Sequence, residues 1–355
     1  MISRDISEKI LTLGCQYKHP LGGIGQVLSN YNKYVFSEFK CIVNSKKSST
    51  WHNIILLISA IFKTIFALTI DRKIELVHIH TSYYRSFQRS VLFARIARLF
   101  GKKVVFHVHS GGFKEYAKKH NRYVQKHLHA VDAVIALSDS WKSYFEDELH
   151  CKHVFALNNV ISPPQVNTNI MPDASQLHLL YLGLIHRQKG IYDLLDAIKG
   201  YVQQNNSGII LHIGGNGDSE PLKQAIRDNH LESNVFFHGW LGEDSKSYYL
   251  NLCDALVLPS YFEGLPMSII EAFSYAKPVI ATRVGAIPEI VNDGYNGLLI
   301  SPGDIAALIE AIKTIDTQRD QLSQMSKNAK LCANQFLPEN VSMQLETIYK
   351  QIIGC

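Results

Sequence analysis

Short apolar runs alternate with stretches of helical periodicity along most of the chain. Runs of this length between turn residues are typical of buried strands, and the stretches between them repeat apolar residues at helical spacing. Strands alternating with helices form parallel sheets, so the pattern predicts an α/β fold with doubly wound sheets. The runs lie at residues 10–13, 75–80, 104–109, 131–137, 179–183, 209–213, 235–237, 255–258 and 278–281.

A polar, Pro-rich segment at residues 161–169 separates two such series and has the composition of a linker. At 355 residues the chain is longer than a usual single domain. We therefore predict two Rossmann-like domains, residues 1–162 and 163–336, that face a central cleft with ligands beyond the carboxyl ends of the strands. Residues 337–355 are amphipathic with no strand after them, and we expect them to pack back on the first domain.

Residues 54–70 are strongly apolar and are interrupted by Lys63 and Thr64. The stretch is at the short limit for a membrane-spanning helix, and a lysine at mid-bilayer is costly. A buried helix of the first domain, or a helix lying on a membrane surface, fits the pattern better. The basic residues nearby suit the second of these.

Charge is distributed unevenly between the two halves. Residues 1–162 hold 23 lysines and arginines against 11 acidic residues, a net +12, whereas residues 163–355 hold 13 against 20, a net −7. The basic half indicates an anionic partner, either nucleic acid or an anionic membrane surface, unless it is only a solvated face. It lacks the interleaved aromatics of nucleic-acid-binding modules, so we expect no nucleic acid.

Cysteine and histidine spacing indicates no metal centre. The six cysteines are scattered, which is typical neither of a zinc site nor of a disulfide framework. His78, His80 and His107 alternate along expected strands without metal-ligand spacing, and we interpret them as structural. The N-terminus shows no secretory signal, so the sequence predicts a cytoplasmic protein.

The clearest candidate chemistry lies between the expected strands 255–258 and 278–281. Pro266 suits the first position of a helix over residues 267–274, which places Glu263 just before the helix and Glu271 inside it. A helix N-terminus attracts phosphate, whereas carboxylates accept hydrogen bonds from the hydroxyls of a polyol. Phosphate together with polyol suggests a nucleotide sugar.

Other candidates follow other expected strands. Gly22 and Gly23 come after the first strand and suit either a phosphate-approaching turn or a simple tight turn. Arg187 and Lys189 belong to a basic loop after residues 179–183, where a solvated loop cation is the alternative, above all for Arg187. His109 ends a strand, and the alternative for it is a core histidine bonded to the backbone.

These motifs resemble the retaining glycosyltransferases of family 4, which have the GT-B fold. Glu263 and Glu271 match the E-x7-E pair of that family within EGLPMSIIEA, and Lys189 with Gly190 matches its basic loop. Residues 284–289 resemble its VGGIPE turn and residues 296–299 its NGLL segment. Gly22-Gly23-Ile24 resembles its glycine turn, and His109 its active-site histidine.

The resemblance implies a retaining, metal-independent hexosyltransferase. It would move a hexose from a UDP- or GDP-linked donor to a saccharide or lipid-linked saccharide during envelope polysaccharide synthesis, without a cofactor. The sequence has no Asp-x-Asp pair to hold a metal, and Leu184 stands where the family often has an arginine, which Arg187 would replace. The implied catalytic residues are His109, Glu263 and Lys189, and the implied donor-binding residues are Gly23, Arg187, Lys189, Gly215, Asn216, Glu263, Gly264, Leu265, Pro266 and Glu271.

The resemblance and the basic first half together imply a peripheral enzyme on the cytoplasmic face of the cell membrane. Its partners would be the donor, the acceptor and an anionic membrane surface. Two other functions stay open: a non-hydrolysing nucleotide-sugar epimerase of the same architecture, and a nucleic-acid-binding protein that uses the basic half.

Overall fold

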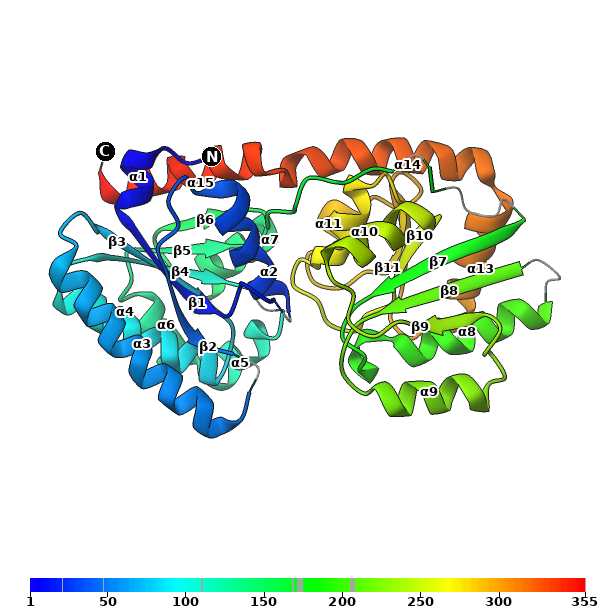
Figure 1. Ribbon diagram of the computed structural model, residues 1–355, viewed down its shortest axis with the longest axis horizontal. Coiled ribbons are helices and arrows are strands. Elements are labelled where there is room, and N and C mark those ends of the chain that lie inside the picture. Colours follow the sequence, from blue (N-terminus) through cyan, green and yellow to red (C-terminus); the bar gives the residue numbers. More distant parts are fainter. Residues whose placement is uncertain are drawn as a thin grey trace. The chain divides into compact units, whose positions relative to one another are not determined.

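The computed structural model describes residues 1–20, 22–46, 48–109, 111–167, 169–170, 175–204 and 208–354. The chain divides into two compact units (Figure 1). Unit 1 comprises Met1–Ser162 and Gln335–Cys355, and unit 2 comprises Pro163–Asn334. Each unit has its own sheet and its own buried core.

In unit 1, the described strands form a parallel sheet of six with the order β2-β1-β3-β4-β5-β6. The strands are β1 Ile10–Cys15, β2 Cys41–Ser45, β3 Leu76–Thr81, β4 Lys103–Val108, β5 Ala133–Ala136 and β6 Val154–Ala156. The helices are α1 Arg4–Glu8, α2 Gly23–Asn30, α3 Thr50–Ile70, α4 Arg85–Leu99, α5 Phe113–Lys119, α6 Asn121–Leu128, α7 Asp139–Ser143 and α15 Pro338–Ile353.

In unit 2, the described strands form a second parallel sheet of six with the order β12-β11-β10-β7-β8-β9. The strands are β7 Gln176–Leu182, β8 Gly208–Gly214, β9 Val235–Phe237, β10 Ala255–Leu258, β11 Val279–Thr282 and β12 Gly297–Ile300. The helices are α8 Ile191–Gln204, α9 Ser219–Asp228, α10 Glu243–Leu252, α11 Met267–Ser274, α12 Ile287–Ile290, α13 Ile305–Thr317 and α14 Arg319–Ala333.

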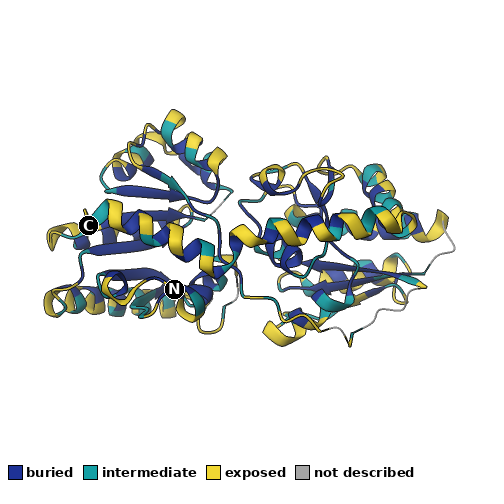
Figure 2. Cartoon of the chain, turned by 90° about the horizontal axis from the view of Figure 1, so that it is seen from above, coloured by how far each residue is buried: buried dark blue, intermediate teal, exposed yellow. Residues whose placement is uncertain are grey.

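Both sheets confirm the predicted doubly wound α/β architecture. The central strands are buried between layers of helices (Figure 2) because most of their side chains are apolar on both faces, whereas β2 and β9 are only partly buried. Each strand order reverses at one place, between β1 and β3 in unit 1 and between β7 and β10 in unit 2. In open parallel sheets the crevice at such a reversal, beyond the carboxyl ends of the strands, is where ligands bind.

The chain passes from unit 1 to unit 2 inside the segment expected as a linker. Ser162 donates its hydroxyl to Asn30 of unit 1 at 3.0 Å, whereas the Gln165 amide donates to the Tyr275 hydroxyl of unit 2 at 3.0 Å. The boundary between these two anchors therefore falls at Ser162 and Pro163.

The return to unit 1 comes at Gln335, two residues before the expected start at 337. Gln335 accepts a hydrogen bond from Asn158, and the carbonyl of buried Phe336 accepts one from the Ile161 amide. Both contacts are made before α15 begins. The helix itself, which contributes buried Tyr349, belongs to unit 1.

Helix α3 is not the buried helix that was one reading of residues 54–70. Only Ala60, Thr64 and Leu68 are buried along its 21 residues. By length and composition it is the one helix, among the described residues, that qualifies as a candidate membrane span. Most of its apolar side chains are instead exposed or only partly buried on the surface of unit 1.

Candidate active site

Two loops meet where the strand order of unit 2 reverses. Strands β7 and β10 are hydrogen-bonded neighbours, with Leu179 in register with Ala255. The loop after β7 carries Lys189, and the loop after β10 carries Glu263. The fold therefore brings two predicted residues together that are far apart in sequence.

Glu263 is the centre of a small polar network. Its Oε1 accepts from Lys189 Nζ at 2.6 Å and from Ser260 Oγ at 2.8 Å, and its side chain is only 10% exposed. The Ser260 carbonyl in turn accepts from the Thr282 hydroxyl at the end of β11. Oε2 has no partner among the described residues, so this oxygen can accept a hydrogen bond from a ligand hydroxyl.

The turn at residues 284–289 packs against the backbone of the Glu263 loop and supports it. Ala286 donates its amide to the Gly264 carbonyl at 2.9 Å. Gly285 has φ +57°, and a Cβ at this position would lie 2.1 Å from the Glu263 carbonyl oxygen. Only glycine allows both the left-handed backbone and this close approach.

Lys189 ends a 3₁₀ turn over Arg187–Lys189 that is tied to the Glu263 loop. Its Nζ donates to the Phe262 carbonyl at 3.1 Å as well as to Glu263. Gly190 follows with φ +68°, and a Cβ there would lie 2.0 Å from the Pro259 carbonyl oxygen. An ammonium has three N–H donors, so one donor of Lys189 is left for a ligand.

Arg187 is exposed and does not join Lys189 and Glu263. Its guanidinium lies 5.0 Å from the centre of the Tyr192 ring, a cation–π distance. Leu184, at the position where the family often has arginine, is 45% exposed and contributes no charge. The replacement of that arginine by Arg187 stays a prediction.

Helix α11 begins at Met267 and ends at Ser274, as predicted, but Pro266 precedes the first helical residue rather than forming it. Its ψ of 124° is extended, and no described side chain caps the helix. Gly264 and buried Leu265 lead into this N-terminus. The first amides of α11 are therefore open to an acceptor such as phosphate.

Glu271 lies inside α11 and is paired with a lysine that sequence reasoning missed. Its Oε1 forms an ion pair with Lys246 Nζ of α10, and both side chains are largely buried at 11% and 20% exposure. Lys246 lies in the charged run Glu243-Asp244-Ser245-Lys246 without a motif of its own. Only the packing of α10 beside α11 reveals it.

Gly215 and Asn216 follow β8 and hold the start of the Lys189 loop. The Asn216 carbonyl accepts from the Ile185 amide at 2.7 Å. A Cβ on Gly215 would lie 1.9 Å from the Gly183 carbonyl oxygen, so any other residue would push the two loops apart. The described contacts show that Gly215 and Asn216 support the loop that carries Lys189.

Gly23 and His109 belong to unit 1. Gly23 begins α2, after β1, and His109 follows the last residue of β4. His109 Nε2 lies 2.8 Å from His80 Nδ1, and the side chain also hydrogen-bonds Asn159. Burial lowers the pKa of His109 to about 3, so its ring is neutral at neutral pH.

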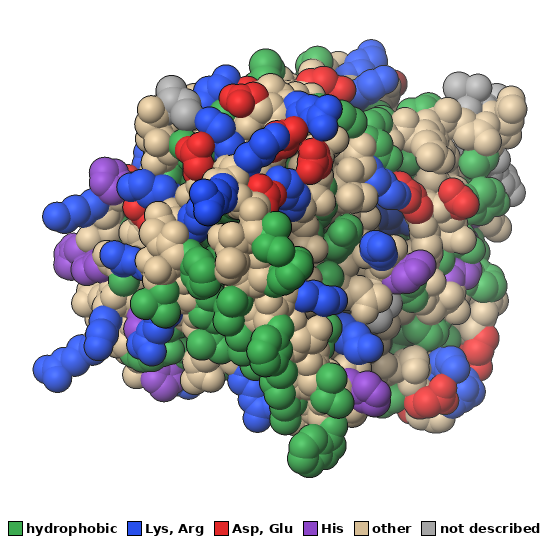
Figure 3. Space-filling view, turned by 60° about the vertical axis from the view of Figure 1, so that its left-hand side comes forward, with side chains coloured by type: hydrophobic (Ala, Val, Ile, Leu, Met, Phe, Trp, Pro, Cys, Tyr) green, Lys and Arg blue, Asp and Glu red, His purple; other side chains and the backbone are tan. Residues whose placement is uncertain are grey.

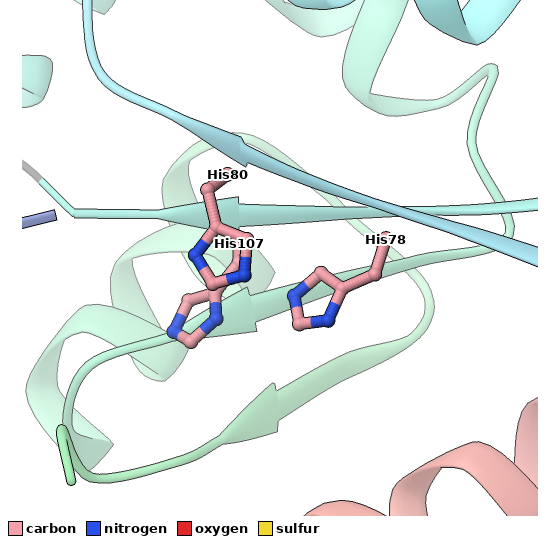
Figure 4. A group of neighbouring side chains, drawn as sticks. All are labelled: His78, His80 and His107. Carbon is pink, nitrogen blue, oxygen red and sulfur yellow. The ribbon is translucent and has the colours of Figure 1, made fainter. Parts of the chain in front are cut away.

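His109 extends a stack of histidines in the core of unit 1. His78 and His80 come from β3 and His107 from β4, and their rings lie close together (Figure 4) with one nitrogen from each within 4.8 Å of the others. His78 Nδ1 lies 2.6 Å from the Tyr349 hydroxyl of α15. Burial lowers the pKa values of all three rings. Their interpretation as structural residues stays a prediction.

The comparison with protein families falls on unit 2. Residues 171–331 match the family described as Glycosyl transferases group 1. These residues contain both loops, α11 and the residues that support them. Unit 2 is therefore similar to the glycosyl transferases group 1 family over nearly its whole length.

Known proteins resemble the chain over different lengths. A protein of Klebsiella pneumoniae described as an uncharacterized 41.2 kDa protein in cps region is 24% identical over 93% of this chain and 96% of its own length. An uncharacterized glycosyltransferase of Methanocaldococcus jannaschii is 29% identical, but the match covers 62% of this chain and 60% of the relative. O-antigen chain mannosyltransferase C of Escherichia coli is 23% identical over 61% of this chain and 60% of that enzyme.

Solved structures extend the similarity to both units. HepE of Anabaena in complex with UDP-glucose matches 98% of this chain and 100% of its own, with a TM-score of 0.75 at 17% identity. At this identity the likeness shows the fold. The predicted GT-B fold is therefore confirmed.

Proposed function

We propose that the protein is a retaining, metal-independent hexosyltransferase. It takes a hexose from a UDP- or GDP-linked donor and passes it to a saccharide or lipid-linked saccharide. The observation that carries the proposal is the pair of Lys189 and Glu263, 2.6 Å apart at the strand-order reversal of unit 2, within the residues matched by the glycosyltransferase family.

The donor diphosphate would lie between Lys189 and the N-terminus of α11. Transfer breaks the bond between the anomeric carbon and the diphosphate, and negative charge builds on the leaving oxygens. The remaining donor of Lys189 and the open amides of α11 are positioned before reaction, so they stabilise this charge without reorganising. These groups can take the place of a metal, and Arg187 would add a further positive charge.

Glu263 would hold hydroxyls of the transferred sugar through Oε2, while Oε1 stays bonded to Lys189 and Ser260. Glu271 would bind the ribose hydroxyls, with Lys246 fixing the orientation of its carboxylate. Gly215 and Asn216, and Gly264 to Pro266, would shape the donor pocket. His109 and Gly23 would act from unit 1, His109 as a neutral hydrogen-bonding group near the reacting carbon.

The acceptor would belong to envelope polysaccharide synthesis at the cytoplasmic face of the cell membrane. Two observations support this part of the proposal: a relative is described as an O-antigen chain mannosyltransferase, and α3 exposes its apolar face within residues 1–162, which have a net charge of +12. An anionic membrane surface would then be a partner of unit 1.

A transfer assay with a matched control tests the proposal. Glu263→Gln removes the charge that holds Lys189 and should lower the turnover number at least about a hundredfold, the scale typical of losing one preorganised electrostatic group. The control is Glu220→Gln, which breaks an exposed pair with Lys223 in α9 and should leave turnover unchanged. Nuclear magnetic resonance of the product should show that the anomeric configuration of the donor is kept.

Three results would contradict the proposal. Full activity of a folded Glu263→Gln variant would remove Glu263 from the reaction. Inversion of the anomeric centre would contradict the retaining mechanism. Conversion of the donor into an epimer with no acceptor present would favour the epimerase.

A further inference from the structure

Unit 1 contains a cavity that the donor site of unit 2 does not use. Its volume is about 950 Å³, within the range of small-molecule sites. It is lined by residues that follow β1 and β2 and by the first turns of α4, which follows β3. The cavity therefore lies at the reversal of strand order between β1 and β3, the place where an open parallel sheet binds its ligand.

The polar wall of this cavity is cationic. Arg85 and Arg89 come from α4, and Lys46 follows β2, while none of the described lining residues is acidic. Arg89 Nε is buried and has no hydrogen-bond partner among the residues that the structure describes. A buried N–H with no acceptor is costly, so this guanidinium is arranged for an acceptor that a ligand supplies.

The N-terminus of α2 adds to the same wall. Gly22 and Gly23 line the cavity, and no side chain in the described part of the chain caps this eight-residue helix. Its first amides and the positive end of the helix favour an anion. Two arginines, a lysine and open amides together suit a phosphate group, which accepts hydrogen bonds from several directions.

The opposite wall is apolar and continues to the protein surface. Ile54 and Leu57 of α3 and Leu92 of α4 line the cavity. Ile54 is also a member of the exposed stripe on α3, which runs along one side of the helix at spacings of three and four residues. The stripe consists of Trp51, Ile54, Ile55, Ile58, Phe62, Ile65 and Phe66.

This stripe forms a continuous apolar surface. Trp51 is 76% exposed and Phe62 69%. In the space-filling view, hydrophobic side chains gather on this side of the molecule with Lys and Arg beside them (Figure 3). An apolar patch rimmed by cations fits a lipid with an anionic head rather than a second copy of the same basic surface.

We propose that this cavity binds the phosphate group of a lipid-linked acceptor, whose hydrocarbon chain leaves past Ile54 and Leu57 and lies along the exposed face of α3. Arg85, Arg89 and the amides of Ile24 and Gly25 in the first turn of α2 hold the phosphate, and α3 inserts its stripe among the surrounding lipids. The role as acceptor rests on the proposed function, whereas the binding of lipid phosphate does not depend on it.

Vesicle flotation of the full chain tests the binding site. One set of phosphatidylcholine vesicles carries a long-chain prenyl phosphate, and a second carries an equal charge of cholesteryl hemisuccinate, which is anionic without phosphate. Arg89→Gln should weaken binding to the prenyl phosphate vesicles at least about tenfold relative to wild type. The control is Arg95→Gln on the same helix α4, which is exposed and outside the cavity and should bind as wild type.

Further arms separate the lipid from other occupants. The double variant Phe62→Ser, Phe66→Ser should lose binding to both kinds of vesicle. A soluble hexose phosphate should compete poorly with prenyl phosphate vesicles; full competition at equal concentration would overturn the lipid part. If Arg89→Gln and Arg95→Gln lost vesicle binding equally, or if wild type bound both kinds of vesicle equally, the binding would come from general surface charge and the phosphate site would be contradicted. Dimers that dissociate in the serine variant would assign the stripe to a second copy.

Donor binding is measured in the same variants to keep the two proposals apart. Arg89→Gln should bind nucleoside diphosphate as wild type does, because Arg89 is not among the proposed donor-binding residues. If Lys189→Ala bound donor normally while Arg89→Gln lost the vesicles, the proposed function would fail and the lipid site would stand. If Lys189→Ala lost donor binding while Arg89→Gln bound the vesicles as wild type does, the lipid site alone would be overturned.

Discussion

At the scale of single residues, the site depends on ion pairs of a lysine and a glutamate whose members keep spare hydrogen-bonding capacity. Lys189 spends two donors inside the protein and keeps one, and Glu263 spends Oε1 and keeps Oε2. Glu271 of α11 and Lys246 of α10 form a second ion pair of the same kind. Each pair orients its members before a ligand arrives, which reduces the entropy that binding must cost.

The buried histidines of unit 1 predict a pH dependence of stability. The pKa of His78 falls from 6.5 to about 3 through burial, and His107 is shifted in the same direction. Below pH 6.5 the unfolded state binds a proton at His78 that the folded state does not bind until about pH 3, and His107 contributes in the same direction. Stability therefore falls as pH falls through this window, by up to about 1.4 kcal/mol per pH unit for each histidine.

Denaturant unfolding of unit 1 at several pH values between 4 and 7.5 measures this slope. His107→Leu should make the slope shallower, whatever it does to stability at pH 7. His153→Asn changes an exposed histidine and should leave the slope as in wild type. Equal slopes in all three proteins would contradict the account.

The same histidines allow a test for metal. If they are structural, the purified protein should contain no stoichiometric zinc or other transition metal by mass spectrometry. Hexosyl transfer should also proceed unchanged after treatment with EDTA, because Lys189 and α11 carry the leaving-group charge. A bound metal lost together with activity, and restored with it, would contradict both the structural interpretation and the metal-independent mechanism.

At the scale of elements, glycines hold the active-site loops against one another. Gly190 and Gly285 both have positive φ, and both meet carbonyl oxygens of the loop that carries Glu263. The backbone of this loop thus has close neighbours on two sides. The position of Glu263 consequently depends on the loops that carry Gly190 and Gly285 as well as on its own loop.

Substitution of Gly285 isolates this support. Gly285→Ala combines an unfavourable φ with a Cβ 2.1 Å from the Glu263 carbonyl, whereas Gly294→Ala has a similar φ of +74° and nothing within 4 Å. Both should lose about 1–3 kcal/mol of stability from the backbone. Only Gly285→Ala should lose most of its transfer activity, measured where both variants are folded. Similar activity in the two variants would contradict the supporting role.

At the scale of the whole molecule, both units place their functional groups by the same rule. Each parallel sheet reverses its strand order once, and each reversal carries a cationic site at the carboxyl ends of the strands. In unit 2 acids accompany the cations, which suits a sugar nucleotide. In unit 1 an apolar wall accompanies them, which suits a lipid phosphate.

Local pattern predicted much of this architecture. Strands β9 and β10 and helix α11 lie where the apolar runs and Pro266 placed them. The short strand Cys41–Ser45 gave no such signal because it mixes polar and apolar residues. Side-chain pairing was less accessible: Lys246 is 25 residues from Glu271, and the cavity of unit 1 draws on segments between residues 15 and 92. Such contacts follow from strand order, which no local pattern contains.

The central claim is that Lys189 and Glu263 hold the donor, and calorimetric titration of nucleoside diphosphate tests it most directly. UDP and GDP are titrated into wild type, Lys189→Ala and the control Lys223→Ala, whose lysine pairs with Glu220 at 2.7 Å on the surface of α9. Wild type and Lys223→Ala should bind one of the nucleotides with equal affinity, and Lys189→Ala should bind it at least about tenfold more weakly, a loss of about 1.4 kcal/mol. Equal affinity in all three folded proteins would contradict the account.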